Sequence, residues 1–214
     1  MTESSQVMIF TRYPEPGKTK TRLIPTLGAK GAARLQRRMT EHIVTEALAL
    51  ARQRLLAVSV HYEGGNRRCM TRWLGKGLIF HRQVSGDLGR RMLYAFRKAF
   101  DGGIRRGILA GSDIPKLDRT IMEQALDHLD KQDLVLGPAR DGGYYLIGMN
   151  QALLVHSGAR LFGSLPWGTG EVLTQTLKAA HRAGLSFRLL PPLNDVDRPA
   201  DLALVEGEFI DKTR

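Results

Sequence analysis

The chain has 214 residues, of which 43% are hydrophobic and 25% are charged, a composition typical of a folded globular protein. Its formal net charge of +11 favours anionic partners, although the arginines are scattered in pairs and form no basic tail. No apolar run approaches the roughly 18 residues that span a membrane, no secretory signal is visible, and the single cysteine, Cys69, excludes an internal disulfide. A cytoplasmic location is therefore the default expectation.

Short apolar segments alternate with amphipathic segments along nearly the whole chain. The apolar segments predict strands at 7–10, 55–60, 78–80, 108–110, 134–136, 144–148 and 187–190. The amphipathic segments predict helices at 29–54, 66–74, 88–100, 120–129, 171–183 and 200–206. The strands lack a clean two-residue alternation, which is typical of a mostly parallel sheet covered on both faces.

No linker, repeat or low-complexity segment interrupts this pattern, so we expect one α/β domain of three layers over residues 1–214. The glycine-rich segment 139–169 breaks the alternation. It is the expected place of a non-parallel strand and of an active-site loop.

A basic cluster follows the first predicted strand. Lys18, Lys20 and Arg22 stand on alternate positions and would share one side of an extended segment. Three adjacent cations suit a polyphosphate ligand, because lysine offers point charges and arginine a fork of donors. The segment lacks both the P-loop and the GxGxxG patterns, and a solvated basic loop is an equally good interpretation.

Acidic side chains stand at two places that a parallel sheet would bring to one edge. Asp113, in GSDIP, follows the fourth predicted strand, where open α/β sheets bind ligands. Asp195 and Asp197 precede the last predicted helix and could complete a cation site with Asp113. Mg²⁺ needs only one or two protein carboxylates when phosphates and water supply the rest. The alternative is that these acids cap the helices that follow them.

Paired glycines follow Asp141. Gly142 and Gly143 separate this acid from Tyr144, and they permit either a tight turn between two strands or the close approach of a ligand. Trp167 belongs either to the core or to a site where it stacks on a ring.

A second glycine-containing loop, 83–92, lies between a predicted strand and a predicted helix. Gly86 would let a nucleobase approach the backbone near Gln83, whereas Asp87 is a good candidate for the helix N-cap. The six histidines match no metal-binding spacing and are expected to be structural or surface groups.

Together these motifs resemble a bacterial family of uncharacterised, glycosyltransferase-like proteins (DUF2064) in the nucleotide-diphospho-sugar transferase superfamily. The matching segments span nearly the whole chain in one order: PxPGKxKTRL at 14–23, GDLGxRM at 86–92, GSDIP at 111–115, GPAxDGGYYLIG at 137–148, WGT at 167–169 and DVDxPxDL at 195–202. The resemblance implies a Rossmann-like, three-layer GT-A fold with a mostly parallel mixed sheet. The KxKxRL and DxDxPxDL elements are also similar to those of phospholactate guanylyltransferases and sugar-acid cytidylyltransferases.

The resemblance further implies a metal-dependent glycosyltransferase that uses a nucleotide-sugar donor. The implied nucleotide and phosphate ligands are Lys18, Lys20, Arg22, Gln83, Gly86 and Asp87. The implied Mg²⁺ or Mn²⁺ ligands are Asp113, Asp195 and Asp197. The implied acceptor or sugar side is formed by Gly142, Gly143, Tyr144 and Trp167. The implied catalytic residues are Asp113, Asp141 and Lys20.

Two departures from related families leave the reaction type open. GT-A glycosyltransferases carry Asp-x-Asp after the fourth strand, where this chain has only Asp113, and sugar nucleotidyltransferases carry a GxGxR loop that is missing here. Nucleotidyl transfer with release of pyrophosphate is therefore an alternative, and a nucleotide-binding protein without turnover is another. Nucleic acid is not an expected partner, because no basic helix with interleaved aromatic residues is present.

Overall fold

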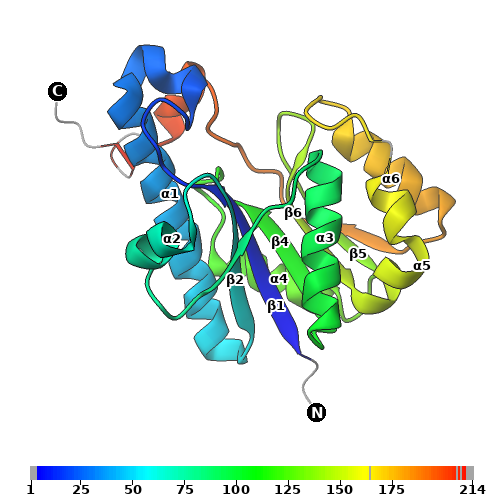
Figure 1. Ribbon diagram of the computed structural model, residues 1–214. Coiled ribbons are helices and arrows are strands. Elements are labelled where there is room, and N and C mark those ends of the chain that lie inside the picture. The colour runs from blue at the N-terminus through cyan, green and yellow to red at the C-terminus, as the bar shows by residue number, and fades with distance from the viewer. Residues whose placement is uncertain (1–3, 164, 206, 208, 211–214) are drawn as a thin grey trace.

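A seven-stranded sheet forms the centre of the computed structural model, which describes residues 4–163, 165–205, 207, 209 and 210 (Figure 1). The strand order is β3-β2-β1-β4-β6-β5-β7. The bounds are β1 Ser5–Arg12, β2 Ala57–Glu63, β3 Ile79–Arg82, β4 Arg106–Gly111, β5 Leu134–Pro138, β6 Tyr144–Asn150 and β7 Phe187–Leu189. Strand β6 is antiparallel to β4 and β5, and the other pairs of named strands are parallel. The prediction of a mostly parallel sheet with a non-parallel strand in segment 139–169 is confirmed.

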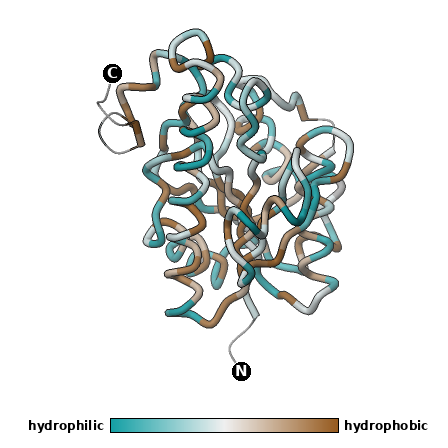
Figure 2. The backbone as a smooth tube through the Cα atoms, turned by 60° about the vertical axis from the view of Figure 1, so that its left-hand side comes forward, coloured by the Kyte–Doolittle hydropathy of each residue, from teal (hydrophilic) through white to brown (hydrophobic). Residues whose placement is uncertain are grey.

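Helices cover both faces of this sheet, so the three-layer prediction is also confirmed (Figure 1). The bounds are α1 Ile24–Arg54, α2 Arg67–Leu74, α3 Leu88–Asp101, α4 Arg119–His128, α5 Gln151–Phe162 and α6 Val172–Arg182. Alternate residues of β1 point to opposite faces: Val7 and Ile9 pack in one core with α1, α2 and α4, whereas Met8 packs in another with α3, α5 and α6. Hydrophobic residues accordingly run through the interior and recur along the helices that surround it (Figure 2).

Two predicted elements differ from the structure. Helix α5 was not predicted, because it begins directly after β6 with no turn between them and contains Ser157 and Gly158, which are poor helix formers. The last predicted helix is a 3₁₀ helix over Pro199–Leu204, and Glu206 lies outside the described residues.

The C-terminal segment packs against the first part of α1 and so lies at the carboxyl edge of the sheet. Gly28 has non-helical backbone angles (φ 68°) and kinks the helix there. A third apolar cluster then joins this part of α1 to the end of the chain through Leu35, Val196, Leu202 and Phe209. Residues 195–197 are thereby placed beside the loop that follows β1.

A buried polar chain crosses the α3-facing side of the sheet. Gln6 Nε2 donates to Ser59 Oγ at 2.7 Å, and Ser59 Oγ lies 3.2 Å from His61 Nε2. Burial, assisted by the charges of His81 and Lys98, lowers the pKa of His61 to about 3. His61 is therefore neutral in the fold, as expected of a structural histidine, although it takes up a proton near pH 6.5 when the chain unfolds.

This depressed pKa predicts that stability is lost on acidification. The unfolded chain binds a proton that the fold excludes, so the contribution is fully present above about pH 6.5 and is lost as the pH falls toward 3. We expect about 2 kcal/mol of unfolding free energy to be lost between pH 7 and pH 5 through this group. Urea denaturation of wild type and His61→Gln at both pH values checks this. The difference in unfolding free energy between the two proteins should be smaller at pH 5 than at pH 7 by that amount. The same difference at both pH values would contradict the prediction.

Candidate active site at the carboxyl edge of the sheet

Lys20 and Asp113 meet where β1 and β4 end. Lys20 Nζ lies 2.9 Å from Asp113 Oδ2 and donates a 2.6 Å hydrogen bond to the carbonyl of Val196, while the Val196 N–H donates to the Asp113 carbonyl at 3.0 Å. The Lys20 side chain is only 3% exposed, compared with 46% for Asp113. Asp113 does not cap the following helix, because the N-cap of α4 is Asp118. The capping alternative for Asp113 is therefore wrong.

The three cations after β1 do not share one side, so the prediction of an extended segment is wrong. The buried Thr19 hydroxyl donates to the Tyr13 carbonyl and folds the loop back, and Lys20 adopts a left-handed conformation (φ 50°) before a 3₁₀ helix over Thr21–Leu23. Lys18 is 72% exposed and pairs with Glu15 at 2.8 Å. Lys20 turns inward to Asp113, and Arg22 pairs with Asp197.

Replacing Lys20 tests the importance of its inward position. Lys20→Met removes the donor to Asp113 and Val196, and we expect the unfolding free energy to fall by about 1–3 kcal/mol. Lys18→Met is the matched control, because its exposed pair with Glu15 should contribute no more than about 0.5 kcal/mol. Chemical denaturation measures both values, and equal losses would contradict the inward role of Lys20.

The acidic residues near the C-terminus lie at the same carboxyl edge of the sheet. Asp195 and Asp197 flank Val196, which is fully buried, and both line one cavity. Neither caps the last helix: Arg198 is the N-cap, and Asp201 Oδ2 accepts from the N–H groups of Asp197 and Arg198 at 3.0 and 2.7 Å. The capping alternative for Asp195 and Asp197 is therefore also wrong.

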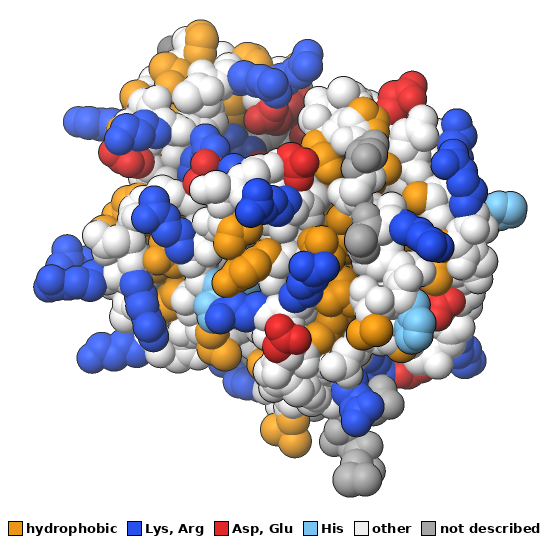
Figure 3. Space-filling model, turned by 45° about the vertical axis from the view of Figure 1, so that its right-hand side comes forward, with side chains coloured by type: hydrophobic (Ala, Val, Ile, Leu, Met, Phe, Trp, Pro, Cys, Tyr) orange, Lys and Arg blue, Asp and Glu red, His pale blue; other side chains and the backbone are white. Residues whose placement is uncertain are grey.

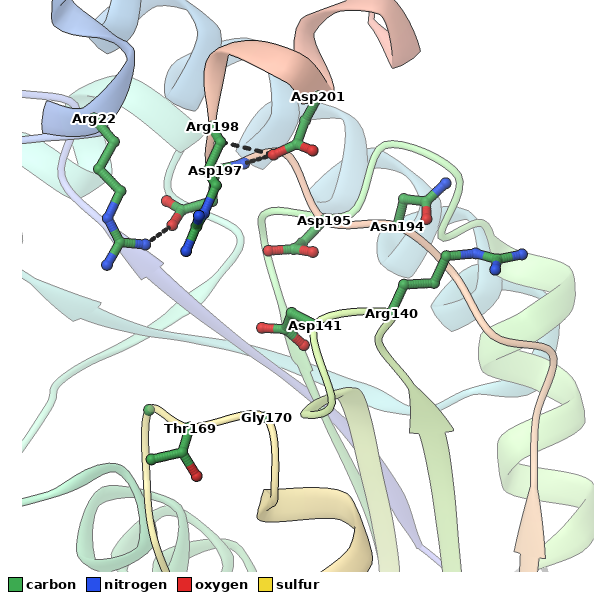
Figure 4. Close-up of a pocket in the computed structure, with 11 residues that line it drawn as sticks. Arg22, Arg140, Asp141, Thr169, Gly170, Asn194, Asp195, Asp197, Arg198 and Asp201 are labelled. Atoms are coloured by element: carbon green, nitrogen blue, oxygen red, sulfur yellow. Dashed lines mark hydrogen bonds and ion pairs between the residues drawn. The ribbon is translucent and has the colours of Figure 1, made fainter.

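Two adjoining cavities make up a cleft along this edge. The first, the acidic cavity, encloses about 380 Å³ and is lined by four aspartates and three arginines: Asp141, Asp195, Asp197, Asp201, Arg22, Arg140 and Arg198 (Figure 4). The second, the aromatic cavity, encloses about 370 Å³ and is lined by Asp113 together with Tyr144, Tyr145 and Trp167. Arg22, Asp141 and Asp195 line both cavities. The space-filling view shows a hollow with red and blue side chains, whereas the remaining cations are scattered over the surface (Figure 3).

Carboxylates face one another across the acidic cavity. Asp141 and Asp195 lie on neighbouring loops (Figure 4). Burial raises the pKa of Asp195, and the negative charges of Asp141 and Asp201 raise it further, while Lys20 opposes them. A cation bound between these carboxylates would relieve both the burial and the mutual repulsion.

The glycine pair after Asp141 forms a tight turn between β5 and β6, as one of the two interpretations predicts. Gly142 has a φ of +90° and its N–H donates to the Ala139 carbonyl at 3.1 Å. A Cβ at Gly142 would lie 2.0 Å from the Gly170 carbonyl oxygen. Gly143 N–H donates to Asp141 Oδ1 at 2.9 Å and fixes that carboxylate at the cavity mouth. The group that approaches Gly142 closely is therefore the 168–170 loop of the chain itself.

Trp167 both packs on the core and lines the aromatic cavity. Its ring stands edge-on to Tyr144, with 6.4 Å between centroids, and it lies so near α3 that a Cβ at Gly89 would come within 2.6 Å of it. The buried Nε1 of Trp167 has no hydrogen-bond acceptor among the described residues.

The loop predicted to hold a nucleobase is fixed by its own contacts. Asp87 caps α3 by accepting from Arg90 N–H at 2.8 Å, as the N-cap interpretation predicts. Gln83 Nε2 donates to the His61 carbonyl at 2.9 Å, and Arg91 Nε donates to the Gly86 carbonyl at 2.9 Å. Gln83, Gly86 and Asp87 line neither cavity of the cleft, which the adjacent Leu88 reaches.

The carboxylates at this edge suit a hard cation that takes most of its ligands from substrate and water. Among the described residues, no group of three or more His, Cys, Asp or Glu side chains is placed to hold a metal ion. Asp113 and Asp195 both line the aromatic cavity and offer only carboxylate oxygens. Mg²⁺ and Mn²⁺ accept such a set when substrate phosphates and water supply the remaining ligands.

Sequence reasoning missed a buried polar network directly beneath Asp113. Gln36 Nε2 donates to Ser112 Oγ at 2.9 Å, and the Ser112 hydroxyl donates to Thr11 Oγ1 at 3.1 Å. Thr11 Oγ1 also lies 2.8 Å from Thr40 Oγ1. These residues come from β1, α1 and the end of β4, so no local pattern could group them. Arg140 and Thr169 line the acidic cavity and could have been found, because Arg140 adjoins Asp141 and Thr169 belongs to the WGT motif at 167–169.

This strand order, with the loops of the cleft at one edge of the sheet, matches the fold of the nucleotide-diphospho-sugar transferases. The chain belongs to the family described as "Uncharacterized protein conserved in bacteria (DUF2064)", whose model matches residues 45–169. It is 35% identical to a structure from Desulfovibrio desulfuricans G20 described as a "putative nucleotide-diphospho-sugar transferase", covering 99% of this chain and 90% of that one with a TM-score of 0.88.

More distant structures share the fold alone. CMP:2-keto-3-deoxy-manno-octonic acid synthetase, complexed with CTP, is 15% identical, covering 95% of this chain and 97% of that one with a TM-score of 0.59. Glucosyl-3-phosphoglycerate synthase from Mycobacterium tuberculosis, in complex with Mn²⁺, UDP and glucosyl-3-phosphoglycerate, is 13% identical, covering 95% and 76% with a TM-score of 0.61. No curated protein matches the chain. Among the described residues, no helix combines the length and apolar character needed to cross a bilayer.

Proposed function

We propose that the protein is a divalent-metal-dependent glycosyltransferase that uses a nucleotide-sugar donor. The observation that carries this proposal is the convergence of Asp113, Lys20 and segment 195–197 beside the aromatic cavity. The similarity to a structure described as a nucleotide-diphospho-sugar transferase supports it.

Asp113 and Asp195, or alternatively Asp197, would hold Mg²⁺ or Mn²⁺ together with the donor phosphates. The ion would neutralise negative charge that develops on the leaving diphosphate. Lys20, which is buried and already bonded to Asp113, would orient this carboxylate. This positioning role modifies the expectation that Lys20 contacts phosphate directly.

The remaining residues of the cleft divide between donor and acceptor. Arg22 reaches both cavities and would bind the diphosphate, with the exposed Lys18 as a further cation. The base would lie toward the loop that contains Gln83, Gly86 and Asp87. The sugar ring would lie against Tyr144 and Trp167, beside the turn at Gly142 and Gly143.

Asp141 would act as the base for the acceptor. Its carboxylate is exposed at the junction of the two cavities. The acceptor hydroxyl oxygen would bond to the anomeric carbon and give its proton to Asp141. The bond between that carbon and the β-phosphate oxygen would break, and the nucleoside diphosphate would leave with the electron pair.

The geometry supports glycosyl transfer over nucleotidyl transfer for a physical reason. Nucleotidyl transfer needs several cations around a triphosphate, whereas of Lys18, Lys20 and Arg22 only Arg22 lines the cleft, since Lys20 is held by Asp113 and the Val196 carbonyl. Glycosyl transfer needs a pocket beyond the metal, and the aromatic cavity is such a pocket. One observation favours nucleotidyl transfer as the second candidate, namely that Asp195 and Asp197 flank Val196, which is hydrogen-bonded to Asp113.

The released product distinguishes the two reactions. A thermal-shift screen of nucleoside triphosphates and nucleotide sugars with Mn²⁺ selects the donor, and product analysis follows with a mixture of sugar and phosphate acceptors. We expect a nucleotide sugar to give a nucleoside diphosphate. Pyrophosphate from a triphosphate would replace the proposal with the second candidate. Binding without either product would favour a nucleotide-binding protein without turnover.

A further inference from the structure

A separate hollow, here called the outer pocket, lies on the side of the β1–α1 loop that faces α2. It encloses about 430 Å³, within the range of small-molecule sites. Three segments form its walls: the loop after β1 with Tyr13, Pro14 and Pro16, the first part of α1, and Trp73 of α2. None of its lining residues lines the cleft.

The outer pocket is cationic. Lys30, Arg34 and Arg37 line it from one face of α1, to which their spacing of four and three residues brings them, and no carboxylate is among its lining residues. Among the described residues, the exposed side chains of Lys30 and Arg34 have neither a hydrogen bond nor an ion pair, so both are available to a ligand. The acidic cavity differs, because its arginines face four aspartates.

The wall beside these cations is aromatic and is held in place by hydrogen bonds. Tyr13 and Trp73 stand edge to face, with 5.9 Å between ring centroids. Trp73 Nε1 donates to Glu41 Oε1 at 2.7 Å, and the same oxygen accepts from Arg37 Nε at 2.9 Å. The Arg37 guanidinium lies 5.8 Å from the centre of the Trp73 ring. An aromatic wall beside free cations is suited to a flat ring that carries an anionic group.

We infer that the outer pocket is a second binding site, for a small anion that carries a flat ring, and that nucleoside phosphates are the chemical class it takes. The base would contact Tyr13 and Trp73, and the phosphates would meet Lys30 and Arg34. The loop from Tyr13 to Lys20 forms one wall of this pocket and ends at the lysine that holds Asp113. The occupant would therefore touch the same loop that shapes the cleft.

One tryptophan lies at each site, Trp73 at the outer pocket and Trp167 at the cleft, so fluorescence can report binding at the outer pocket alone. Trp167→Phe leaves Trp73 as the only indole, and its fluorescence is titrated with GTP and with CTP in EDTA. We expect a saturable change with at least one of them. Adding Lys30→Ala and Arg34→Ala should weaken this binding at least about tenfold, because two charge-assisted contacts are lost. Inorganic pyrophosphate, which has no ring, should bind at least about tenfold more weakly than the triphosphate.

The matched control removes the same charge elsewhere. Arg52→Ala with Arg97→Ala takes two exposed arginines from α1 and α3, far from the outer pocket residues in the sequence, and should leave the titration unchanged. The inference is overturned by the lack of a saturable change, by equal weakening in both double variants, or by pyrophosphate binding as tightly as the triphosphate. Failure of the proposed glycosyl transfer would not alter these results.

Discussion

Asp113→Asn is expected to lower the rate of nucleoside diphosphate release by at least about a hundredfold, because removing preorganised charge from such a site has effects of this size. The amide retains the shape of the side chain but cannot offer two anionic oxygens. The measurement is the initial rate of release with the donor that the thermal-shift screen selects, at saturating Mn²⁺.

Asp118→Asn is the control for this substitution. Asp118 lies in the same connection between β4 and α4, and it caps α4 by accepting a hydrogen bond from Ile121 N–H at 2.9 Å. It lines neither cavity of the cleft. Asparagine is itself a good N-cap, so both the rate and the fold should be retained. An Asp113→Asn enzyme that stays within about twofold of the wild-type rate would contradict the role assigned to Asp113.

Gly142→Ala is expected to lower the unfolding free energy by about 2–5 kcal/mol, the largest stability effect that we predict for a single methyl group. The added Cβ would lie 2.0 Å from the Gly170 carbonyl oxygen, a backbone atom that cannot move without the 168–170 loop. Overpacking of this kind typically destabilises by roughly 1–3 kcal/mol, and the positive φ of +90° adds roughly 1–2 kcal/mol for an L-residue. Urea denaturation measures the loss.

Gly168→Ala separates these two causes. Gly168 has a φ of +82°, but no atom lies within 4 Å of a Cβ built there. Only the backbone strain of roughly 1–2 kcal/mol should then appear. If both variants lost the same free energy, the packing of the 168–170 loop against the turn at Gly142 would not be the cause.

The order of strands and helices could be predicted because each element is specified by its own residues. Apolar runs such as 134–136 and amphipathic stretches such as 88–100 carry their periodicity locally. The reversed strand was predictable as well, because the glycines around Gly142 mark a turn too short for a crossover helix. Helix α5 was missed since nothing in the sequence separates it from β6.

The candidate site could be predicted only as a set of residues, without its geometry. Asp113 and segment 195–197 are brought to one edge because parallel strands end together. The direction in which Lys20 points depends on the buried Thr19 hydroxyl and on Val196, which is 176 residues away. The outer pocket was likewise hidden, because its aromatic and basic residues come from separate segments.

The most direct test of the metal site at Asp113 is a binding measurement without turnover. Calorimetric titration with UDP, CDP, GDP and ADP, each in Mn²⁺ and in EDTA, compares wild type with Asp113→Asn, and Lys18→Met serves as the control. We predict that at least one nucleoside diphosphate binds wild type and Lys18→Met at least about tenfold more tightly in Mn²⁺ than in EDTA, and that Asp113→Asn loses this gain. Equal affinities in Mn²⁺ and EDTA for all four nucleotides, or an undiminished gain in Asp113→Asn, would contradict the account.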